Sequence, residues 1–194
     1  SSSSSFLVTY KSGSHGASSL SLGSSLSITD DTWHHYAFTM QNSGSSLVVR
    51  LYADGVLNDT KIVSSTVGKV STNTSACIGS LLMSPASSTP GGYDKLGWGQ
   101  LSASVDEFRF WQTARNAKEI GQFWYRPVYG GTSGQELFDH SNSNLTIYYK
   151  FNQPHVGIET YDKVEIDYSG RLANGKIFGN SKSFRNPESA INKS

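Results

Sequence analysis

Charge is scarce in this sequence. Asp, Glu, Lys and Arg together supply 16% of the 194 residues, and the formal net charge is +1. Soluble domains usually carry roughly a quarter of their residues as charges. Proteins that bind nucleic acids normally present clustered Lys and Arg side chains, and this sequence contains no such run. We therefore expect no nucleic-acid partner.

Cysteine and long apolar runs are also missing. Cys77 is the one cysteine, so the chain forms no internal disulfide and must be stabilised by its core. Because Cys77 lies in a strand-like run, we expect it to be a buried small apolar residue. No apolar run approaches the roughly 18 residues that a membrane-spanning helix needs. The sequence therefore predicts no membrane insertion.

What the sequence does contain is the alternating pattern of strands. Tyr36, Phe38 and Met40 alternate with polar or small residues, which is typical of a strand with one buried face. We expect these three side chains to point into a common core. Several further short runs of this kind are separated by Gly, Ser and Asn clusters. The pattern predicts an all-β fold.

Two local signals set the boundaries of elements. Asp54-Gly55 provides the positive φ angles of a type I′ turn, which predicts a hairpin between residues 47–53 and 56–63. Thr113 can cap a helix near residues 114–124, which is the one good helical candidate in the sequence. We therefore expect antiparallel strands with a single short helix.

Three segments, in this order, resemble those of a known family. They are Trp33-His34-His35-Tyr36-Ala37, Leu51-Tyr52-Ala53-Asp54-Gly55 and Val105-Asp106-Glu107-Phe108-Arg109-Phe110. They are similar to the "W-H-H-V-A", "L-Y-V-D-G" and "I-D-E-V-R-I-Y" segments of laminin G-like, concanavalin A-like modules. The resemblance implies an antiparallel β-sandwich of the jelly-roll type and a binding or building module rather than a metabolic enzyme. Trp33 is expected to pack in the core.

The order of the segments is unusual for that family. A strand like residues 145–151, followed by a "D-x-S-G-x-x-x-N-G" segment like residues 167–175, opens a module there. In this sequence it follows the segment that closes one. We therefore predict a sandwich at residues 1–127 that lacks its opening strands, a linker at 128–144, and strands at 145–194 that resemble the start of a module. These last strands either complete the first sandwich or begin a second one.

One carboxylate pair has the spacing of a glycosidase motif. Glu165 and Asp167 alternate as they do in glycoside hydrolases of this fold, where such residues act as nucleophile and general acid. The third carboxylate of that motif is missing, because Ser169 and Gly170 stand in its place. We therefore expect no catalytic residue and no enzyme activity.

A second carboxylate pair is also expected to be structural. Asp106 and Glu107 are adjacent, and neighbouring side chains in a strand point to opposite faces. They cannot act together on one bond. Glu107 is instead expected to pair with Arg109, two residues along on the same face.

Calcium is the one cofactor that the sequence leaves open. His34 and His35 diverge as strand neighbours and do not suit zinc. Aspartates in loops offer the hard oxygen ligands that Ca²⁺ prefers, and similar sandwiches often bind Ca²⁺. The candidates are Asp30, Asp31, Asp54, Asp59 and Asp94. The alternative is that these residues simply form turns.

Aromatic residues in the long loop at 83–99 suggest a ligand site. Tyr93 and Trp98 lie there, and their apolar faces and polar edges suit stacking on a sugar ring or anchoring a protein partner. The alternative is that they pack over the end of a sheet. We name these two residues as the candidate ligand-binding residues.

The composition and the resemblance together predict a non-catalytic structural or recognition module of a larger surface assembly. A disulfide-free chain rich in Ser, Thr, Asn and Gly favours a phage or viral particle protein that mediates attachment or assembly. Its partners would be neighbouring copies or other proteins of the virion. One alternative is a carbohydrate-binding adhesin module of an extracellular bacterial protein, with a cell-surface glycan as partner. A second alternative is a glycoside hydrolase of the concanavalin A-like fold.

Overall fold

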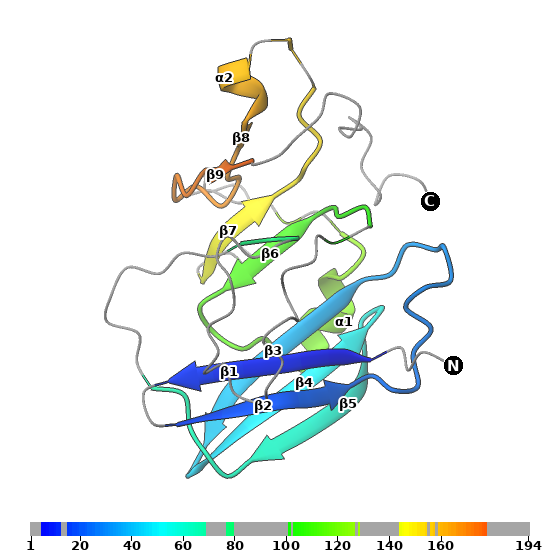
Figure 1. Ribbon diagram of the computed structural model, residues 1–194, viewed down its shortest axis with the longest axis vertical. Coiled ribbons are helices and arrows are strands. Elements are labelled where there is room, and N and C mark those ends of the chain that lie inside the picture. Colours follow the sequence, from blue (N-terminus) through cyan, green and yellow to red (C-terminus); the bar gives the residue numbers. More distant parts are fainter. Residues whose placement is uncertain are drawn as a thin grey trace. The chain divides into compact units, whose positions relative to one another are not determined.

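The chain folds into two compact units, residues Ser1–Ala103 and Ser104–Ser194 (Figure 1). The computed structural model describes residues 5–12, 15–68, 77–79, 101, 103–126, 128, 144–154, 156–157 and 159–177. No helix in these ranges is both long enough and apolar enough to span a membrane.

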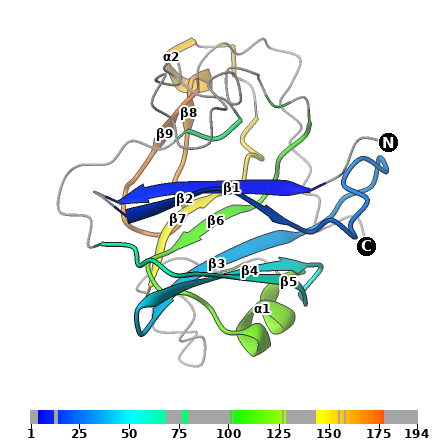
Figure 2. The same cartoon turned by 60° about the horizontal axis from the view of Figure 1, so that its bottom comes forward.

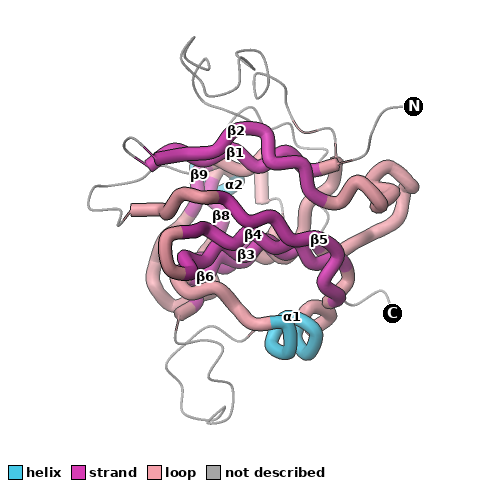
Figure 3. The backbone as a smooth tube through the Cα atoms, turned by 90° about the horizontal axis from the view of Figure 1, so that it is seen from below, coloured by secondary structure: helices cyan, strands magenta, loops and turns pink. Residues whose placement is uncertain are grey.

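In its described residues, the first unit contains five antiparallel strands in two sheets. Strands β1 (Phe6–Ser12) and β2 (His15–Leu22) pair with each other. Strands β3 (Tyr36–Ser43), β4 (Ser46–Ala53) and β5 (Val56–Val63) form a second sheet in the order β3-β4-β5. Figures 2 and 3 show these two sheets as separate layers.

The core of the first unit lies between these two layers. Leu22 from β2 packs with three alternate residues of β4, Leu47, Val49 and Leu51, and all four are at most 1% exposed. Burying a side chain of this kind stabilises a fold by about 1.5–3 kcal/mol. Strand β4 is the middle strand of its sheet, which explains why its alternate side chains form the centre of the core.

The predicted core face of β3 is confirmed for Tyr36, which packs against the buried cluster of the first unit, and is wrong in extent for Phe38 and Met40. Phe38 pairs with Leu51 and Met40 pairs with Val49, so these side chains share the face of the buried leucines and valine. Phe38 is nevertheless 42% exposed and Met40 is 40% exposed. The physical reason is that β3 is an outer strand of the β3-β4-β5 sheet, so neighbouring side chains of that sheet flank it on one side only.

Two other burial predictions are wrong. Trp33 is 55% exposed rather than packed in the core, because it lies in the connection before β3 and not in a strand. Cys77 is exposed as well. It has no regular secondary structure, whereas a strand was predicted there.

The predicted hairpin is confirmed. Asp54 and Gly55 have φ angles of 48° and 80°, and Ala53 pairs with Val56 across the turn. Positive φ at both central residues is the signature of a type I′ turn, which matches the right-handed twist of the strands it joins.

The part of the second unit that the structure describes contains short strands and two short helices. Its elements are β6 (Phe108–Trp111), α1 (Ala117–Phe123), β7 (Leu145–Tyr149), α2 (Glu159–Asp162), β8 (Val164–Glu165) and β9 (Gly175–Lys176). Strand β6 pairs antiparallel with β7, and β8 pairs antiparallel with β9. Val128, Leu145 and Tyr148 form the buried cluster of this unit, against which Trp111 and Tyr168 pack.

The predicted helix is confirmed as α1, but its cap lies elsewhere. Asn116, not Thr113, is the N-cap residue. Its side chain accepts the backbone N–H of Glu119 at 2.9 Å, and the Glu119 carboxylate accepts the N–H of Asn116 at 2.8 Å. This reciprocal pair is a capping box. Helix α2 was not predicted from the sequence.

The architecture is thus mostly antiparallel strands, as predicted, with short helices. The predicted domain boundaries at 127 and 144 stay predictions. Within the second unit, however, β6 belongs to the segment expected to close a module and β7 to the segment expected to open one, and the two strands pair with each other.

Candidate functional site

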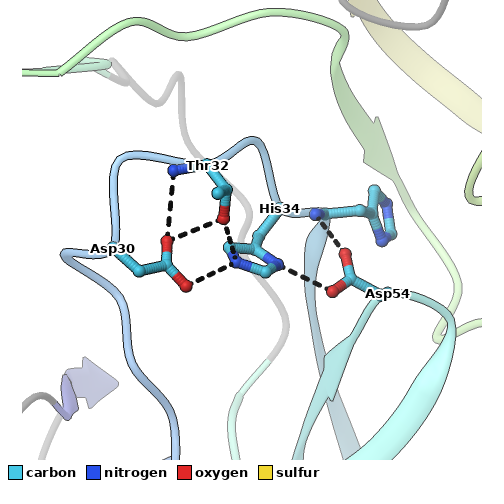
Figure 4. Close-up of polar contacts among 5 residues, drawn as sticks. Asp30, Thr32, His34 and Asp54 are labelled. Atoms are coloured by element: carbon cyan, nitrogen blue, oxygen red, sulfur yellow. Dashed lines mark hydrogen bonds and ion pairs between the residues drawn. The ribbon is translucent and has the colours of Figure 1, made fainter. Parts of the chain in front are cut away.

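The most developed polar cluster of the first unit is centred on His34. The Nδ1 atom of its ring lies 2.8 Å from Oδ2 of Asp54, and its Nε2 atom lies 3.0 Å from Oδ2 of Asp30. Asp54 belongs to the β4–β5 turn, whereas Asp30 lies in the connection between β2 and β3. Figure 4 shows the imidazole between the two carboxylates. The ring therefore joins two separate loops.

This geometry favours a proton on both ring nitrogens. A neutral imidazole carries one N–H donor, so one nitrogen lone pair would face a carboxylate oxygen. The hydrogen bond to Asp54, followed by the bond to Asp30, raises the pKa of His34 above its usual 6.5. The hydrogen bond from Thr32, followed by the one from His34, lowers the pKa of Asp30 to about 2. The cluster therefore favours the protonated form of His34, held between the carboxylates of Asp30 and Asp54.

The carboxylates of this cluster also fix the backbone. Oδ1 of Asp54 accepts the N–H of His35 at 2.8 Å, and the N–H of Asp54 donates to the carbonyl of His35 at 2.9 Å. Oδ1 of Asp30 accepts both the N–H of Thr32 at 3.2 Å and its hydroxyl at 2.8 Å. Each carboxylate oxygen of Asp30 and Asp54 thus has a protein donor.

The remaining calcium candidates occupy different positions. Oδ2 of Asp59 accepts the N–H of Gly23 at 3.1 Å, and its Oδ1 accepts the N–H of Thr60 at 2.7 Å. Asp31 is exposed and has a left-handed φ of 59°. Over the described ranges, no group of three or more His, Cys, Asp and Glu residues is arranged to hold a metal ion. Calcium binding stays a prediction.

Tyr93, Asp94 and Trp98 lie outside the described residues. Their predicted roles in ligand and calcium binding stay predictions as well.

In the second unit, the carboxylate of Asp167 is a hydrogen-bond centre. Its Oδ1 accepts the backbone N–H groups of Tyr148 and Ser169, both at 2.9 Å. Its Oδ2 accepts the Ser169 hydroxyl at 2.7 Å and the N–H of Ala173 at 2.9 Å. Burial alone would raise the pKa of Asp167, but the bonds from Ser169, Tyr148 and Ala173 outweigh burial and lower it. This carboxylate holds β7 to the turn that follows β8.

Glu165 has a related structural contact. It is 3% exposed, and its Oε1 accepts the backbone N–H of Phe151 at 2.9 Å, just beyond β7. The two carboxylates that share a glycosidase-like spacing therefore both receive N–H groups from the chain in or just after β7.

The predicted pair of Glu107 and Arg109 is confirmed. Nη2 of Arg109 lies 2.9 Å from Oε2 of Glu107, and the two side chains are 5% and 12% exposed. Arg109 also donates to the carbonyl groups of Phe123 at 3.2 Å and Arg126 at 2.7 Å. The Tyr148 hydroxyl donates to the same Glu107 oxygen at 2.5 Å. Burial, followed by this bond, raises the pKa of the Tyr148 hydroxyl. The network ties β6, the C-terminal end of α1 and β7 together.

Sequence reasoning treated the histidines and the loop aspartates separately and missed the cluster around His34. Asp54 is 20 residues beyond His34, so spacing alone does not connect them. The sequence did contain one signal, which is that a Trp-His-His segment and an Asp-Gly segment occur together. The structure joins these two segments through contacts of His34 and His35 with Asp54.

These motifs agree with a family assignment. The family model described as the concanavalin A-like lectin/glucanases superfamily matches residues 1–121, and the chain belongs to this superfamily. The resemblance seen in the sequence is thereby confirmed. Membership indicates a carbohydrate-binding or structural module. No curated protein and no solved structure matches the chain.

Proposed function

We propose that this chain is a non-catalytic structural or recognition module of a larger surface assembly, built as a jelly-roll β-sandwich. The observation that supports the proposal is the set of hydrogen bonds that the Asp167 carboxylate accepts. This carboxylate receives four hydrogen bonds from residues of its own unit. A glycosidase nucleophile or general acid needs a carboxylate directed at the substrate. Asp167 serves instead as an acceptor for the backbone.

Two further carboxylates, Glu165 and Glu107, support the same view. Glu165 receives a backbone N–H, and Glu107 is shared between Arg109 and Tyr148. A buried carboxylate with such partners contributes to stability, and removing it leaves unpaired donors.

Among surface assemblies, we favour a phage or viral particle. The support is compositional: the chain is poor in charge and contains a single cysteine, which suits assembly without an oxidising secretory route. Neighbouring copies or other particle proteins would be its partners. Exposed apolar side chains on β5, such as Val56 at 70% and Ile62 at 71%, are compatible with contacts of this kind.

A carbohydrate-binding adhesin module is the second candidate. The name of the superfamily includes lectins, and Trp33 and Tyr125 are both largely exposed aromatic residues. Aromatic rings with polar edges suit sugar recognition. In this role a cell-surface glycan would be the partner.

Two measurements on the full chain test the proposal. Incubation with β-glucans should release no reducing sugar. Sedimentation over a range of protein concentrations should reveal self-association if copies of the chain contact one another. Hydrolysis that is lost in the double variant E165Q/D167N would overturn the proposal and establish a glycosidase. A strictly monomeric chain that binds glycans would favour the adhesin module over the particle protein.

A further inference from the structure

The two outer strands of the β3-β4-β5 sheet differ in how they resist pairing with another strand. An open strand edge offers N–H and C=O groups to other chains, and proteins commonly block it with inward-pointing charges or bulges. In β5, Asp59 pairs with the buried Leu51, and a bulge interrupts the register with β4. Lys61 of β5 likewise pairs with the buried Val49, so both charges lie on the core side of the sheet. Strand β3 contains no charge and no proline, and its register with β4 is regular.

The backbone of β3 presents hydrogen-bonding groups on the side away from β4. In an antiparallel pair, successive residues direct their N–H and C=O groups alternately toward and away from the partner strand. The carbonyl of His35 accepts the N–H of Asp54 at 2.9 Å, so His35 and every second residue after it face β4. The residues that face the other way are Tyr36, Phe38, Met40 and Asn42. In the part of the chain that the structure describes, β4 is the one strand that pairs with β3. The other edge of β3 can therefore accept a further strand.

The side chains beside this edge are apolar and incompletely covered. The Phe38 ring packs against Phe6 of β1 with ring centroids 5.2 Å apart, yet Phe38 is 42% exposed. Met40 is 40% exposed and borders a hollow that Tyr10 and Leu47 also line. The opposite layer therefore leaves part of the β3 face uncovered, and a strand added beside β3 would bring side chains to that part.

The sequence of β3 is self-complementary in one antiparallel register. When Thr39 lies opposite Thr39 of a second copy, each Phe38 lies opposite Met40 of the other copy. Phe38 and Met40 both direct their backbone groups outward, so they can bond each other across the junction. An aromatic ring beside a thioether sulfur is a favourable contact, and no charge is buried. Both copies use the same surface, which is the requirement for a closed twofold dimer.

We propose that the open edge of β3 pairs antiparallel with β3 of a second copy, joining the two β3-β4-β5 sheets into one continuous sheet across a twofold axis at Thr39. The pairing of Phe38 with Met40 favours a second copy, and the uncharged β3 offers no attraction to a charged partner. This inference rests on the structural role proposed above, and it assigns the contacts between copies to one strand.

Sedimentation of the full chain over a range of concentrations tests the pairing. M40K places a charge on the core side of β3, as Asp59 and Lys61 do on β5, and should convert the dimer to the monomer. I62K is the matched control, because Ile62 lies on the other outer strand and is 71% exposed. It should leave the dimer intact. Circular dichroism verifies that both variants fold.

A disulfide tests the register independently of M40K. The background is C77S, which removes the natural cysteine. In it, T39C should form a covalent dimer on oxidation, because the Cα atoms of such an opposed pair lie about 4.5 Å apart, within the range of a disulfide. Q41C should not, because Gln41 lies opposite Ala37 in this register, roughly 13 Å along the strand from Gln41 of the second copy. Non-reducing gel electrophoresis provides the measurement.

Several outcomes would overturn the inference. They are a chain that stays monomeric at every concentration, a dimer that M40K leaves intact, and equal cross-linking of T39C and Q41C. Slow hydrogen exchange at the Phe38 and Met40 amides in the dilute monomer would mean that another segment of the same chain pairs with β3, and it would overturn the inference too.

The inference and the proposed function can fail separately. A dimer that is lost in I62K and kept in M40K would assign the contact to β5, so the inference would fail and the structural role would stand. Hydrolysis of β-glucans by a chain that still dimerises through β3 would contradict the non-catalytic function and leave the pairing of β3 standing.

Discussion

The carboxylate of Asp167 accepts the backbone N–H of Tyr148 at 2.9 Å. Tyr148 lies in β7, and its side chain is fully buried. A single side chain from a later turn therefore provides an acceptor to a strand, much as a neighbouring strand would. The stability of the second unit should depend on this carboxylate more than on its surface charges.

The variant D167N tests this dependence. An amide in place of the carboxylate would put an NH₂ group against at least one of the four donors, and an unsatisfied buried polar group costs about 1–3 kcal/mol. We expect D167N to lower the free energy of unfolding by at least that amount in urea titrations. D31N, a change of the same kind at an exposed residue, should have little effect. Equal stability of D167N and the unmodified chain would contradict the role of Asp167.

The His34 cluster should make stability depend on pH. The folded pKa of His34 is raised, so its contribution is present below pH 6.5 and is lost as the pH rises through the folded pKa. The folded pKa of Asp30 is lowered from 3.8 to about 2, so its contribution is present above pH 3.8 and is lost as the pH falls toward 2. The cluster should thus be most stabilising between about pH 4 and 6.5.

NMR titration of the His34 ring checks this window. We expect a pKa above 6.5 in the unmodified chain and a lower one in D30N, because one of the two carboxylate partners is then neutral. D59N keeps both partners of His34 and provides the control. A His34 pKa at or below 6.5 in the unmodified chain would rule out the doubly bonded imidazolium.

The type I′ turn gives a third prediction. Gly55 has a φ of 80°, which is strongly disfavoured for a β-branched residue. G55V should therefore lower the free energy of unfolding by about 1 kcal/mol or more. V56T, an exposed β-branched replacement at the next position, should change it by less than about 0.5 kcal/mol. An unchanged melting temperature for G55V would count against the turn.

Tyr148 and Glu107 give a fourth prediction. Y148F removes the hydroxyl that donates to Glu107 and preserves the packing of the ring. Hydrogen bonds to charged groups contribute about 1.5–3 kcal/mol, so Y148F should lower the free energy of unfolding by an amount in that range. Y125F removes an exposed hydroxyl and should be neutral. If the two variants were equally stable, the Glu107 contact would have no energetic role.

The sequence predicted what short-range patterns determine. The Asp54-Gly55 turn, the helix near residue 120 and the pairing of Glu107 with Arg109 all depend on neighbours along the chain, and the structure confirms them. The exposure of Phe38 and Trp33 was not predictable, because it depends on which segments cover them. Period-2 alternation identifies the core side of a strand but says nothing of the depth of burial.

The candidate site was predicted less well than the fold. Asp30 and Asp54 were named as oxygen ligands, and the structure shows that both carboxylates contact His34. The partner of a charged loop residue is set by tertiary structure rather than by spacing. For Glu165 and Asp167, the sequence revealed that the third carboxylate of the glycosidase motif was missing. It did not reveal that the carboxylates of Glu165 and Asp167 accept hydrogen bonds from backbone N–H groups.

The pairing of β6 with β7 has a consequence for the rate of folding. In the first unit, β3, β4 and β5 are consecutive strands joined by tight turns, so their contacts are local and form at a small entropic cost. In the second unit, Trp111 pairs with Leu145, and a long loop must close before that contact is gained. Topologies with such distant contacts fold more slowly. The two units should therefore acquire structure at different times, with the β3–β5 meander ordered while the β6–β7 ribbon is still open.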